Sequence, residues 1–355
     1  MAEPDLEPMD KRKGWVSRFW ASIDERLGLD AFRYKVPGYA NTLPYTLGGI
    51  TFFGFLILVI TGVILAQFYH PHPPEANASV RAIVADAPLG FLRSAHFWAA
   101  QAVLVSVSLH VTRVYITAAY KKPREFNWYI GVALLAATIG LMFTGTVLKW
   151  DQEAFEALEH NLEIVSGLGA LGSFFSPSFA AGVPLLTRLY SVHVSLLPLI
   201  FGFLFLAHVF YIRHFGIAPY PFARKTASEK HETFLSHLRK ILVYGLVFFG
   251  IVAALAVAFP APLGPEPIGG IEVTKPPWPF LWLFPIENVL GVQWLLPASV
   301  VPILLLLAVP IVDRGPERDP RRRKLMTIGF IIGLAVFIAL TILGALVPIA
   351  EHMGR

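Results

Sequence analysis

Four histidines stand inside apolar stretches of the chain, and their spacing pairs them. His96 and His110 are fourteen residues apart in HFWAAQAVLVSVSLH, and His193 and His208 are fifteen residues apart further along the chain. An ionisable residue inside a membrane-spanning segment is costly, so it indicates a function. At about 100° and 1.5 Å per residue, each pair lies on one face of a helix, with roughly 21 to 22 Å between its members.

Two helices that carry such pairs side by side would present facing imidazoles at two levels. His96 would be level with His193, and His110 with His208. A zinc or copper site needs three or four protein ligands, whereas a haem iron needs only two axial ones, because the porphyrin supplies four nitrogens. Two haems at two depths would carry electrons across a membrane. A proton relay is the alternative, although it does not require matched levels.

Basic residues and glycines accompany the histidines at related spacings. Arginines near both levels could bind haem propionates, or they could reach from the helix to the membrane interface. These arginines are Arg93, Arg113 and Arg188. Two glycine pairs repeat the fourteen-residue step, which would let a flat ring pass close to the backbone, although glycine also lets helices pack closely. These glycines are Gly48, Gly62, Gly131 and Gly145. The combination predicts a four-helix bundle with haems on its axis.

The composition is that of a polytopic membrane protein. The chain has 355 residues, of which 55% are hydrophobic and 15% charged, and its mean hydropathy is +0.60. Seven apolar runs reach the roughly 20 residues needed to cross a bilayer. We expect all-α spans at 43–69, 93–118, 127–149, 188–212, 240–260, 292–312 and 325–349.

Basic residues alternate between the connections of these spans. They gather before the first span and in the connections after the second, fourth and sixth, whereas 151–187 contains no lysine or arginine. The positive-inside rule therefore places the N-terminus in the cytoplasm and the C-terminus outside. The basic loops are read as topology signals, and not as a nucleic-acid surface. Residues 14–30 could form a helix along the membrane surface, or a solvated tail with a short helix. The polar first 40 residues give no sign of a cleavable signal peptide.

The absence of cysteine excludes several sites within this chain. Disulfides, thiolate metal sites, iron–sulfur ligation and thioether-linked haem all need that residue. Seven further histidines fall in loops or at span ends, namely His70, His72, His160, His214, His231, His237 and His352.

These motifs closely resemble cytochrome b, the dihaem subunit of quinol-oxidising bc-type complexes. The matching stretches are LGGITFFGFLILVITG (47–62), RSAHFWAAQAVLVSVSLHVTRVY (93–115), KKPREFNWYIGV (121–132), WDQ (150–152) and TRLYSVH (187–193). The fifteen-residue histidine step and the stretch YIRHFGIAPYPF (211–222) resemble the photosynthetic bf-type branch, in which four helices and three helices are separate subunits. The resemblance implies a tail at 1–35, a dihaem domain at 36–215, a cytoplasmic linker at 216–239 and a three-helix domain at 240–355.

The resemblance also implies a mechanism and partners. Quinol is oxidised at an outer site, one electron passes to an iron–sulfur (Rieske-like) protein and a c-type cytochrome, and the other crosses two non-covalent b haems to an inner quinone site. Members of the family are dimers. A residue that matches the family's quinone-binding histidine is His214, with Lys240 in place of its usual acid, and His237 and Arg239 as nearby alternatives.

Three departures from the family pattern bear on this mechanism. The outer-site motif Pro-Glu-Trp-Tyr appears as Pro276-Pro277-Trp278-Pro279, so proline replaces the proton-accepting glutamate. The family's Pro-Trp-Gly/Asp-Gln turn appears as Lys149-Trp150-Asp151-Gln152, and the helix after it is acidic, with Glu153, Glu156, Glu159 and Glu163. One of these glutamates, Glu153 or Glu156 with Trp278 nearby, could replace the missing base, although a solvated face or a partner-docking surface is the plainer interpretation. Thr46 stands where bf-type members attach a covalent haem to cysteine.

Two functions follow. The first is a catalytic subunit of a bc-type quinol oxidoreductase that splits the two electrons. The second is a dihaem anchor of another redox complex, with an extracytoplasmic redox partner, a single quinone site and no bifurcation.

Overall fold

A computed structural model describes residues 14–28, 34–180, 182–221 and 231–349 of the chain. Several residues used in the charge argument lie outside these ranges, namely Lys11, Arg12, Lys13, Arg33, Arg224, Lys225 and Lys230, as does His352.

Seven helices of the described chain are long and apolar enough to cross a membrane, which confirms the predicted all-α membrane fold. They are α2 (Leu43–Leu65), α4 (Ala87–Ile116), α5 (Glu125–Leu148), the run Leu185–Phe215, α9 (Phe234–Ala258), the run Val292–Val312 and α12 (Lys324–Leu346). The largest differences from the predicted bounds are six residues, at the starts of α4 and α9. Both helices start earlier than hydropathy predicts because a polar residue caps each N-terminus. The Asp86 side chain accepts from the Leu89 N–H, and the Thr233 side chain accepts from the Ser236 N–H.

The fourth span is divided by a π-helical turn. It consists of α7 (Leu185–Ser191), a π-helix (Val192–Leu196) and α8 (Leu197–Phe215). The sixth span begins with a 3₁₀ turn (Val292–Trp294) and continues as α11 (Leu295–Val312).

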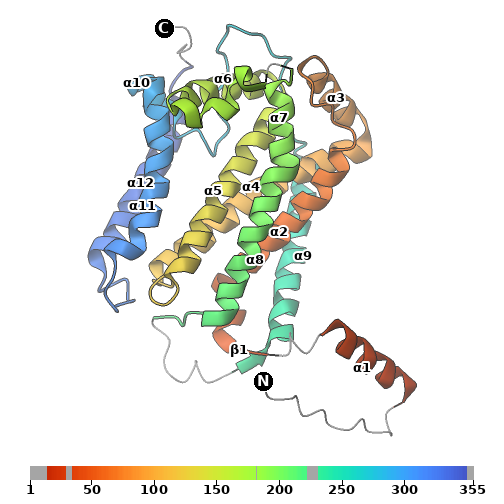
Figure 1. Cartoon of the computed structure of the whole chain (residues 1–355), viewed down its shortest axis with the longest axis vertical. Helices are drawn as coiled ribbons and strands as arrows, with labels where there is room; N and C mark the ends of the chain where they lie inside the picture. The colour runs from red at the N-terminus through yellow and green to blue at the C-terminus, as the bar shows by residue number, and fades with distance from the viewer. Residues whose placement is uncertain (1–13, 29–33, 181, 222–230, 350–355) are drawn as a thin grey trace.

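Shorter elements lie at the two ends of the spans (Figure 1). Helices α3 (Pro73–Ala85), α6 (Gln152–Ser166) and α10 (Phe284–Leu290) lie together at one end, which we call the α6 end. At the other end, called the β1 end, strand β1 (Lys35–Pro37) pairs antiparallel with β2 (His231–Thr233), with Val36 opposite Glu232. Helix α1 (Trp15–Leu27) is the short helix expected at 14–30, and it stops at Gly28, whose φ is 62°. Four further 3₁₀ turns span Gly38–Asn41, Gly169–Leu171, Ser173–Phe175 and Pro177–Ala180.

The first four spans pack as two pairs. Helix α2 packs along α4, and α5 packs along α8. Helix α9 lies against both α2 and α4, whereas α11 lies on the other side of the molecule against α5 (Figure 1). A core of Ile57, Ala95, Ala99, Val252 and Ala256 joins α2, α4 and α9. The predicted division at 215 and 240 stays a prediction, and α9 belongs spatially to the first bundle.

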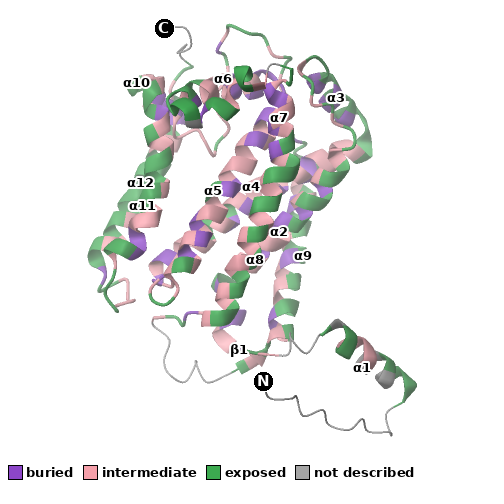
Figure 2. Ribbon diagram, in the orientation of Figure 1, coloured by how far each residue is buried: buried purple, intermediate pink, exposed green. Residues whose placement is uncertain are grey.

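Large apolar side chains cover the outside of the spans. Figure 2 shows exposed residues in green along α8 and α12. Phe203 and Leu206 on α8 are 67% and 66% exposed. A soluble protein rarely exposes such a surface, and lipid would cover it here.

The connection between α9 and α10, residues 259–283, crosses the α6 end and is held there by hydrogen bonds. The Trp98 indole donates to the Phe259 carbonyl (2.7 Å), and the Gly264 N–H donates to Asp151 (2.7 Å). Further along, the Trp278 indole donates to the Gln101 side chain of α4 (2.6 Å). The α9–α10 connection is therefore held against both α4 and the loop that begins α6.

Candidate functional site

The two histidine pairs face each other between α4 and the fourth span. The ring centroids of His96 and His193 lie 6.4 Å apart with 63° between their planes. Those of His110 and His208 lie 6.5 Å apart with 74° between their planes. The structure thus brings together the four residues at two levels, as the spacing predicts.

The π-helix explains why a fourteen-residue step faces a fifteen-residue one. His193 lies on the π-helical turn Val192–Leu196. A π turn contains about one residue more than an α turn, since its hydrogen bonds run from i to i+5. The extra residue is absorbed there, so His208 stays level with His110. Sequence spacing gave the residue count, but it did not locate the turn.

Two threonines orient the imidazoles of the pair at the α6 end. The Thr144 hydroxyl donates to the Gly140 carbonyl (2.8 Å) and lies 2.8 Å from Nδ1 of His193. The Thr61 hydroxyl likewise donates to the Ile57 carbonyl (2.7 Å) and lies 2.9 Å from Nδ1 of His96. Because each hydroxyl proton is already used, the imidazole Nδ1 must be the donor.

The same contacts leave Nε2 of both rings with a free lone pair, which is the form that binds a metal. Sequence reasoning missed both threonines. The available signal was that each immediately precedes a predicted glycine, as Thr61–Gly62 and Thr144–Gly145.

The spacing of the facing rings fits two axial ligands on one metal. An imidazole nitrogen bound to a metal lies about 2 Å from it, and the ring centre about 1 Å further back, so two axial rings place their centroids about 6 Å apart. The observed 6.4 and 6.5 Å agree with this. At the β1 end, Nδ1 of His110 is buried, and no described residue hydrogen-bonds to it.

Each of the four predicted glycines lies against one histidine ring. A Cβ added at Gly145 would lie 2.9 Å from Cε1 of His193. The corresponding distances are 3.1 Å from Gly48 to His110, 3.2 Å from Gly62 to His96 and 3.6 Å from Gly131 to His208. The contact at Gly145 is closer than a real Cβ comes, and those at Gly48 and Gly62 are tight enough that the ring would have to shift, so glycine at these three positions gives room to the imidazole itself.

The three predicted arginines have different surroundings. Arg93 donates to the carbonyls of Ala261 and Pro262 (2.8 and 2.7 Å), which anchors the α9–α10 connection. Arg188 donates to the carbonyls of Phe174 and Ser176 in the loop after α6. The guanidinium of Arg113 lies 4.7 Å above the ring of Tyr45, and its buried Nε has no hydrogen-bond partner among the described residues. Arg113 is therefore the best placed of the three to meet a negatively charged group between the helices.

Comparison with known proteins places the chain in a family. The family described as "Cytochrome b(N-terminal)/b6/petB" matches residues 101–266, and "Cytochrome b(C-terminal)/b6/petD" matches residues 266–353. A cytochrome bc complex cytochrome b subunit from Chlorobaculum thiosulfatiphilum is 30% identical over 360 residues, which cover 94% of this chain and 81% of the relative. The chain belongs to the cytochrome b family. It is the cytochrome b subunit of a bc/b6f-type quinol oxidoreductase complex.

Two further similarities support this placement. Cytochrome b6 from Heliobacterium mobile is 38% identical over 195 residues, covering 53% of this chain and 91% of the relative. A chain of a solved hyperthermophilic respiratory complex III superposes with a TM-score of 0.76 at 26% identity, covering 92% of this chain and 91% of that one. Membership of the cytochrome b family implies b-type haem, and the paired imidazoles fit that group.

The acidic helix α6 of this cytochrome b differs from the solvated face expected from its sequence. Glu156 is only 3% exposed, and its carboxylate accepts from the N–H groups of Val273 and Thr274 (2.9 Å each) and from the Gln152 side chain (2.7 Å). Glu153 forms an ion pair with Lys149. The prediction of a solvated anionic face is therefore wrong for Glu156, because the α9–α10 connection covers it, whereas Glu163 is exposed as expected. A partner-docking surface on the remaining glutamates stays a prediction.

A buried cluster beyond Glu156 was not predicted. Nε2 of His160 lies 2.8 Å from Glu272 and 3.1 Å from Glu287, and both carboxylate side chains are 5% exposed. Its Nδ1 donates to the Glu156 carbonyl (2.8 Å). Burial alone lowers the pKa of His160, but the carboxylate of Glu287, the Glu156 carbonyl and Glu272 outweigh it and raise the pKa to about 9. The three side chains come from α6, the α9–α10 connection and α10, so no local spacing could reveal them.

The quinone-site candidates at the β1 end are spread apart. His214 is exposed and stacks on Phe210, with 6.0 Å between ring centroids. Lys240 lies 3.6 Å from Glu232. Nearby, Nδ1 of the buried His237 lies 2.9 Å from Oδ1 of Asn41. The β1–β2 pairing brings Asn41, Glu232 and His237 together, and sequence reasoning had named only the last of them.

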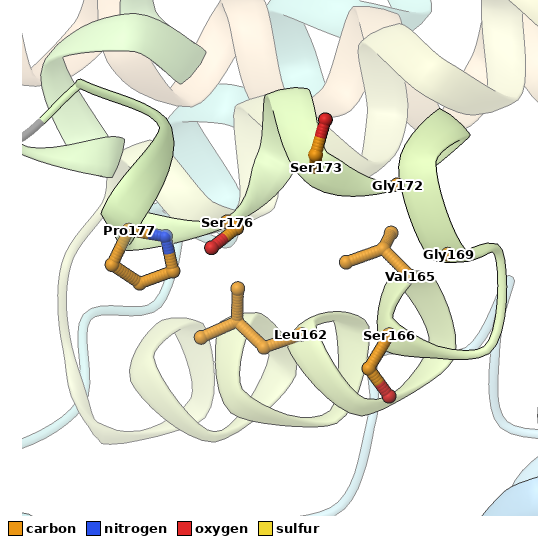
Figure 3. A pocket seen from close by; sticks show the side chains of 8 residues that line it. All are labelled: Leu162, Val165, Ser166, Gly169, Gly172, Ser173, Ser176 and Pro177. Atoms are coloured by element: carbon orange, nitrogen blue, oxygen red, sulfur yellow. The ribbon is translucent and has the colours of Figure 1, made fainter.

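Two other features complete the description. Thr46 is fully buried, and its hydroxyl donates to the Leu43 carbonyl (3.0 Å). A cavity of about 320 Å³ opens between α6 and the loop that follows it, as Figure 3 shows. The cavity is lined by Leu162, Val165, Ser166, Gly169, Gly172, Ser173, Ser176 and Pro177, none of which is a predicted site residue.

Proposed function

We propose that this cytochrome b subunit carries electrons between the two faces of the membrane on two non-covalent b haems. His96 and His193 hold one, and His110 and His208 hold the other. The carrying observation is that both imidazole pairs face each other at the separation of two axial ligands. When bound, the haems supply two one-electron carriers, one above the other between the helices.

The protein contributes orientation to this arrangement. Thr61 and Thr144 keep the metal-binding nitrogens of His96 and His193 free, through the contacts described above. The glycines opposite the rings leave space for the imidazoles between the helices, which a Cβ would take up. Arg113 supplies positive charge beside the pair at the β1 end, where a haem propionate would need it.

The α6 end is the extracytoplasmic one in this proposal. The connections at the β1 end carry Lys121, Arg124, Arg314, Arg318 and Arg323, whereas the loop and helix at 151–187 carry only acidic charges. This distribution supports a cytoplasmic N-terminus and an extracytoplasmic C-terminus.

An outer quinol site is proposed where the α9–α10 connection meets α4, α5 and α6. Trp278 reaches α4 through Gln101, and the ring of Phe280 packs edge-on against Phe143 of α5, with 6.1 Å between centroids. Electron acceptors at this face are an iron–sulfur (Rieske-like) protein and a c-type cytochrome, and we expect the complex to be a dimer.

An inner quinone site is proposed at the β1 end. Asn41, Glu232 and His237 form a hydrogen-bonded group there, with Lys240 beside Glu232. Such a group can hydrogen-bond a quinone carbonyl and supply protons. His214 stays a second candidate, since its exposed ring lies in the last turn of α8, which is also at the β1 end.

One observation favours the second function, a dihaem anchor without bifurcation. Pro277 cannot accept a proton, and the carboxylate of Glu156, which could have replaced the missing base, is occupied by backbone N–H groups. In that function the acceptor would be another extracytoplasmic redox subunit, and a single quinone site would operate.

The deciding experiment is oxidant-induced haem b reduction in native membranes. The inner quinone site is blocked, quinol is added and an oxidant pulse withdraws electrons at the outer face. Increased haem b reduction on oxidation supports bifurcation, whereas simple oxidation supports the anchor. The ligand assignment has a separate check: His110→Ala or His208→Ala must lose a b-type haem, and retention of both haems would overturn it.

A further inference from the structure

The side chains of His160, Glu272 and Glu287 lie so close together that they must share at least one proton. The Glu156 carbonyl can only accept, so Nδ1 of His160 carries a hydrogen. A neutral ring would then point the bare lone pair of Nε2 at two carboxylate groups, 2.8 and 3.1 Å away. That arrangement is repulsive, so at least one further proton resides among these three groups.

The cluster also has room for another proton. One imidazolium and two carboxylates leave a net negative charge in a buried place, which favours protonation. Oε1 of Glu287 is buried, and its one close contact in the cluster is Nε2 of His160 at 3.1 Å, which also lies 2.8 Å from Glu272. One Nε2 hydrogen therefore serves two carboxylates, and a further proton on either of them would lower the cost of burying them side by side.

The surroundings of the cluster contain further acidic groups. Glu159 lies on the same helix, and burial together with Glu156, Glu272 and Glu163 raises its pKa, against the opposite effect of His160. The nearby basic side chain of Lys275 is directed elsewhere, because its ammonium donates to the carbonyls of Gly344 and Ala345 (3.1 and 2.8 Å). Lys275 therefore does not neutralise the cluster through a hydrogen bond.

The α9–α10 connection links the cluster to the proposed quinol site. Glu272 lies five residues before Pro277, which the chain can span in at most about 17 Å. Trp278 then contacts Gln101, which follows His96 by five residues, or about 7.5 Å of helix rise. Glu272 and the proposed quinol site beside Trp278 are therefore joined by one short continuous segment of the α9–α10 connection.

We propose that His160, Glu272 and Glu287 together accept a proton from quinol at the outer site, in place of the carboxylate that Pro277 has replaced. The inference rests on the proposed quinol oxidation. Oxidising one quinol to quinone releases two electrons and two protons. One electron goes to the iron–sulfur partner, and the other enters the electron path that this chain holds between its two histidine pairs. One proton leaves toward the partner, and the other binds a carboxylate of the cluster and exits past the partly exposed edge of His160.

The other acidic groups of α6 do not fit this role. Glu156 is saturated by Val273, Thr274 and Gln152, so protonating it would break the hydrogen bonds that hold the connection. Glu153 is paired with Lys149. Among the acidic groups of α6 and its neighbours named here, the His160 cluster combines two buried carboxylates that share one imidazole with an edge that reaches solvent.

The test measures haem b reduction by quinol in membranes that hold the whole complex, with the inner site blocked, from about pH 6 to about pH 9. Glu287→Gln and Glu272→Gln are compared with Glu75→Gln, which alters a His–Glu pair at the same end that is about two-thirds exposed. We expect both cluster variants to be slower by at least about tenfold near pH 6 and to recover toward high pH, where water accepts protons more easily. Glu75→Gln should match the unmodified protein.

Two outcomes overturn the inference in different ways. If the unmodified protein shows no oxidant-induced haem b reduction, the proposed quinol oxidation fails and the inference fails with it. If it does show that reduction, but both cluster variants keep its rate and pH profile, only the inference fails.

A spectroscopic readout on the unmodified complex keeps the test valid if the variants do not assemble. Adding quinol to the unmodified complex in the presence of oxidant should produce the infrared carbonyl band of a protonated carboxyl group. Its absence overturns the inference, as does its persistence in an assembled Glu287→Gln variant that also contains Glu272→Gln.

Discussion

The hydroxyl of Thr144 lies 2.8 Å from Nδ1 of His193 while donating its own proton to the Gly140 carbonyl. Thr61 makes the same two-way contact with His96. Position along the helix brings the two rings together, but these hydroxyls decide which nitrogen of each ring is available. The pair at the β1 end has no such hydroxyl contact to Nδ1 among the described residues.

Thr144→Val should therefore loosen the haem at the α6 end. The replacement keeps the shape and removes the acceptor for His193 Nδ1, and loss of such an orienting partner typically weakens metal binding about 10- to 100-fold. Thr138→Val is the matched control, because this buried threonine of α5 donates only to the Leu134 carbonyl. The haem content and the haem redox potentials of the two purified variants are compared. Equal values for Thr144→Val and Thr138→Val would contradict the prediction.

Alanine replacements of the four glycines should have graded effects on haem content. Gly145→Ala is expected to be the most damaging, since its Cβ would come within 2.9 Å of His193, and Gly131→Ala the least, at 3.6 Å from His208. Gly140→Ala, with a Cβ at 3.5 Å from flexible Leu197, is a control on α5 away from the rings. A reversed order in the absorbance of the b haems would show that the glycines serve helix packing instead.

Deleting Ser195 should preserve both haems. The deletion converts the π turn into a regular α turn and gives a fourteen-residue step from His193 to His208. Deleting Val103 from α4 is the comparison, because no π turn is present there to absorb it and His110 would rotate by about 100°. We expect the Val103 deletion to lose the haem at the β1 end, and equal haem loss in both would refute the role given to the π turn.

The seven spans and the four histidines could be read from the sequence, because both depend on local regularities. Hydropathy over about 20 residues sets the spans, and helix rise sets the histidine levels. The partners of the histidines could not be read in the same way. Thr61 and Thr144 are ordinary helix residues until the facing helix brings a ring to them.

The α6 end escaped prediction for a related reason. Glutamates at helical spacing indicate a solvated face when nothing is known to cover them. The α9–α10 connection covers Glu156 here, and this connection has no periodicity from which its contacts could be inferred. Glu156 and Glu272 meet their partners over more than 100 residues of chain, at Thr274 and His160 respectively.

The stability of the α6 end should fall as the pH rises. The pKa of His160 is raised from 6.5 to about 9, so its contribution is fully present below pH 6.5 and is lost as the pH rises through about 9. A shift of this size corresponds to at most about 3 kcal/mol. Thermal unfolding across this pH range should show a steeper loss for the unmodified protein than for His160→Gln. Parallel curves would mean that the ring is not charged in the folded state.

Glu156→Gln should release part of the α9–α10 connection. The substitution removes a charged acceptor from two backbone N–H groups, and each lost charged hydrogen bond costs roughly 1 to 3 kcal/mol. Faster hydrogen exchange at Val273 and Thr274 is the expected signal. Glu163→Gln, at an exposed position of the same helix, should leave that exchange unchanged.

The packing of α9 against α2 and α4 has a consequence for how genes of this kind can be divided. Ala95 and Ala99 of α4 meet Val252 and Ala256 of α9 in a buried core that does not depend on the peptide backbone between the fourth and fifth spans. A gene broken at that connection would encode two polypeptides whose contact surface is already complete. We expect fusion and fission at that connection to be close to neutral for the folded assembly, because the buried contacts between α4 and α9 are made without it.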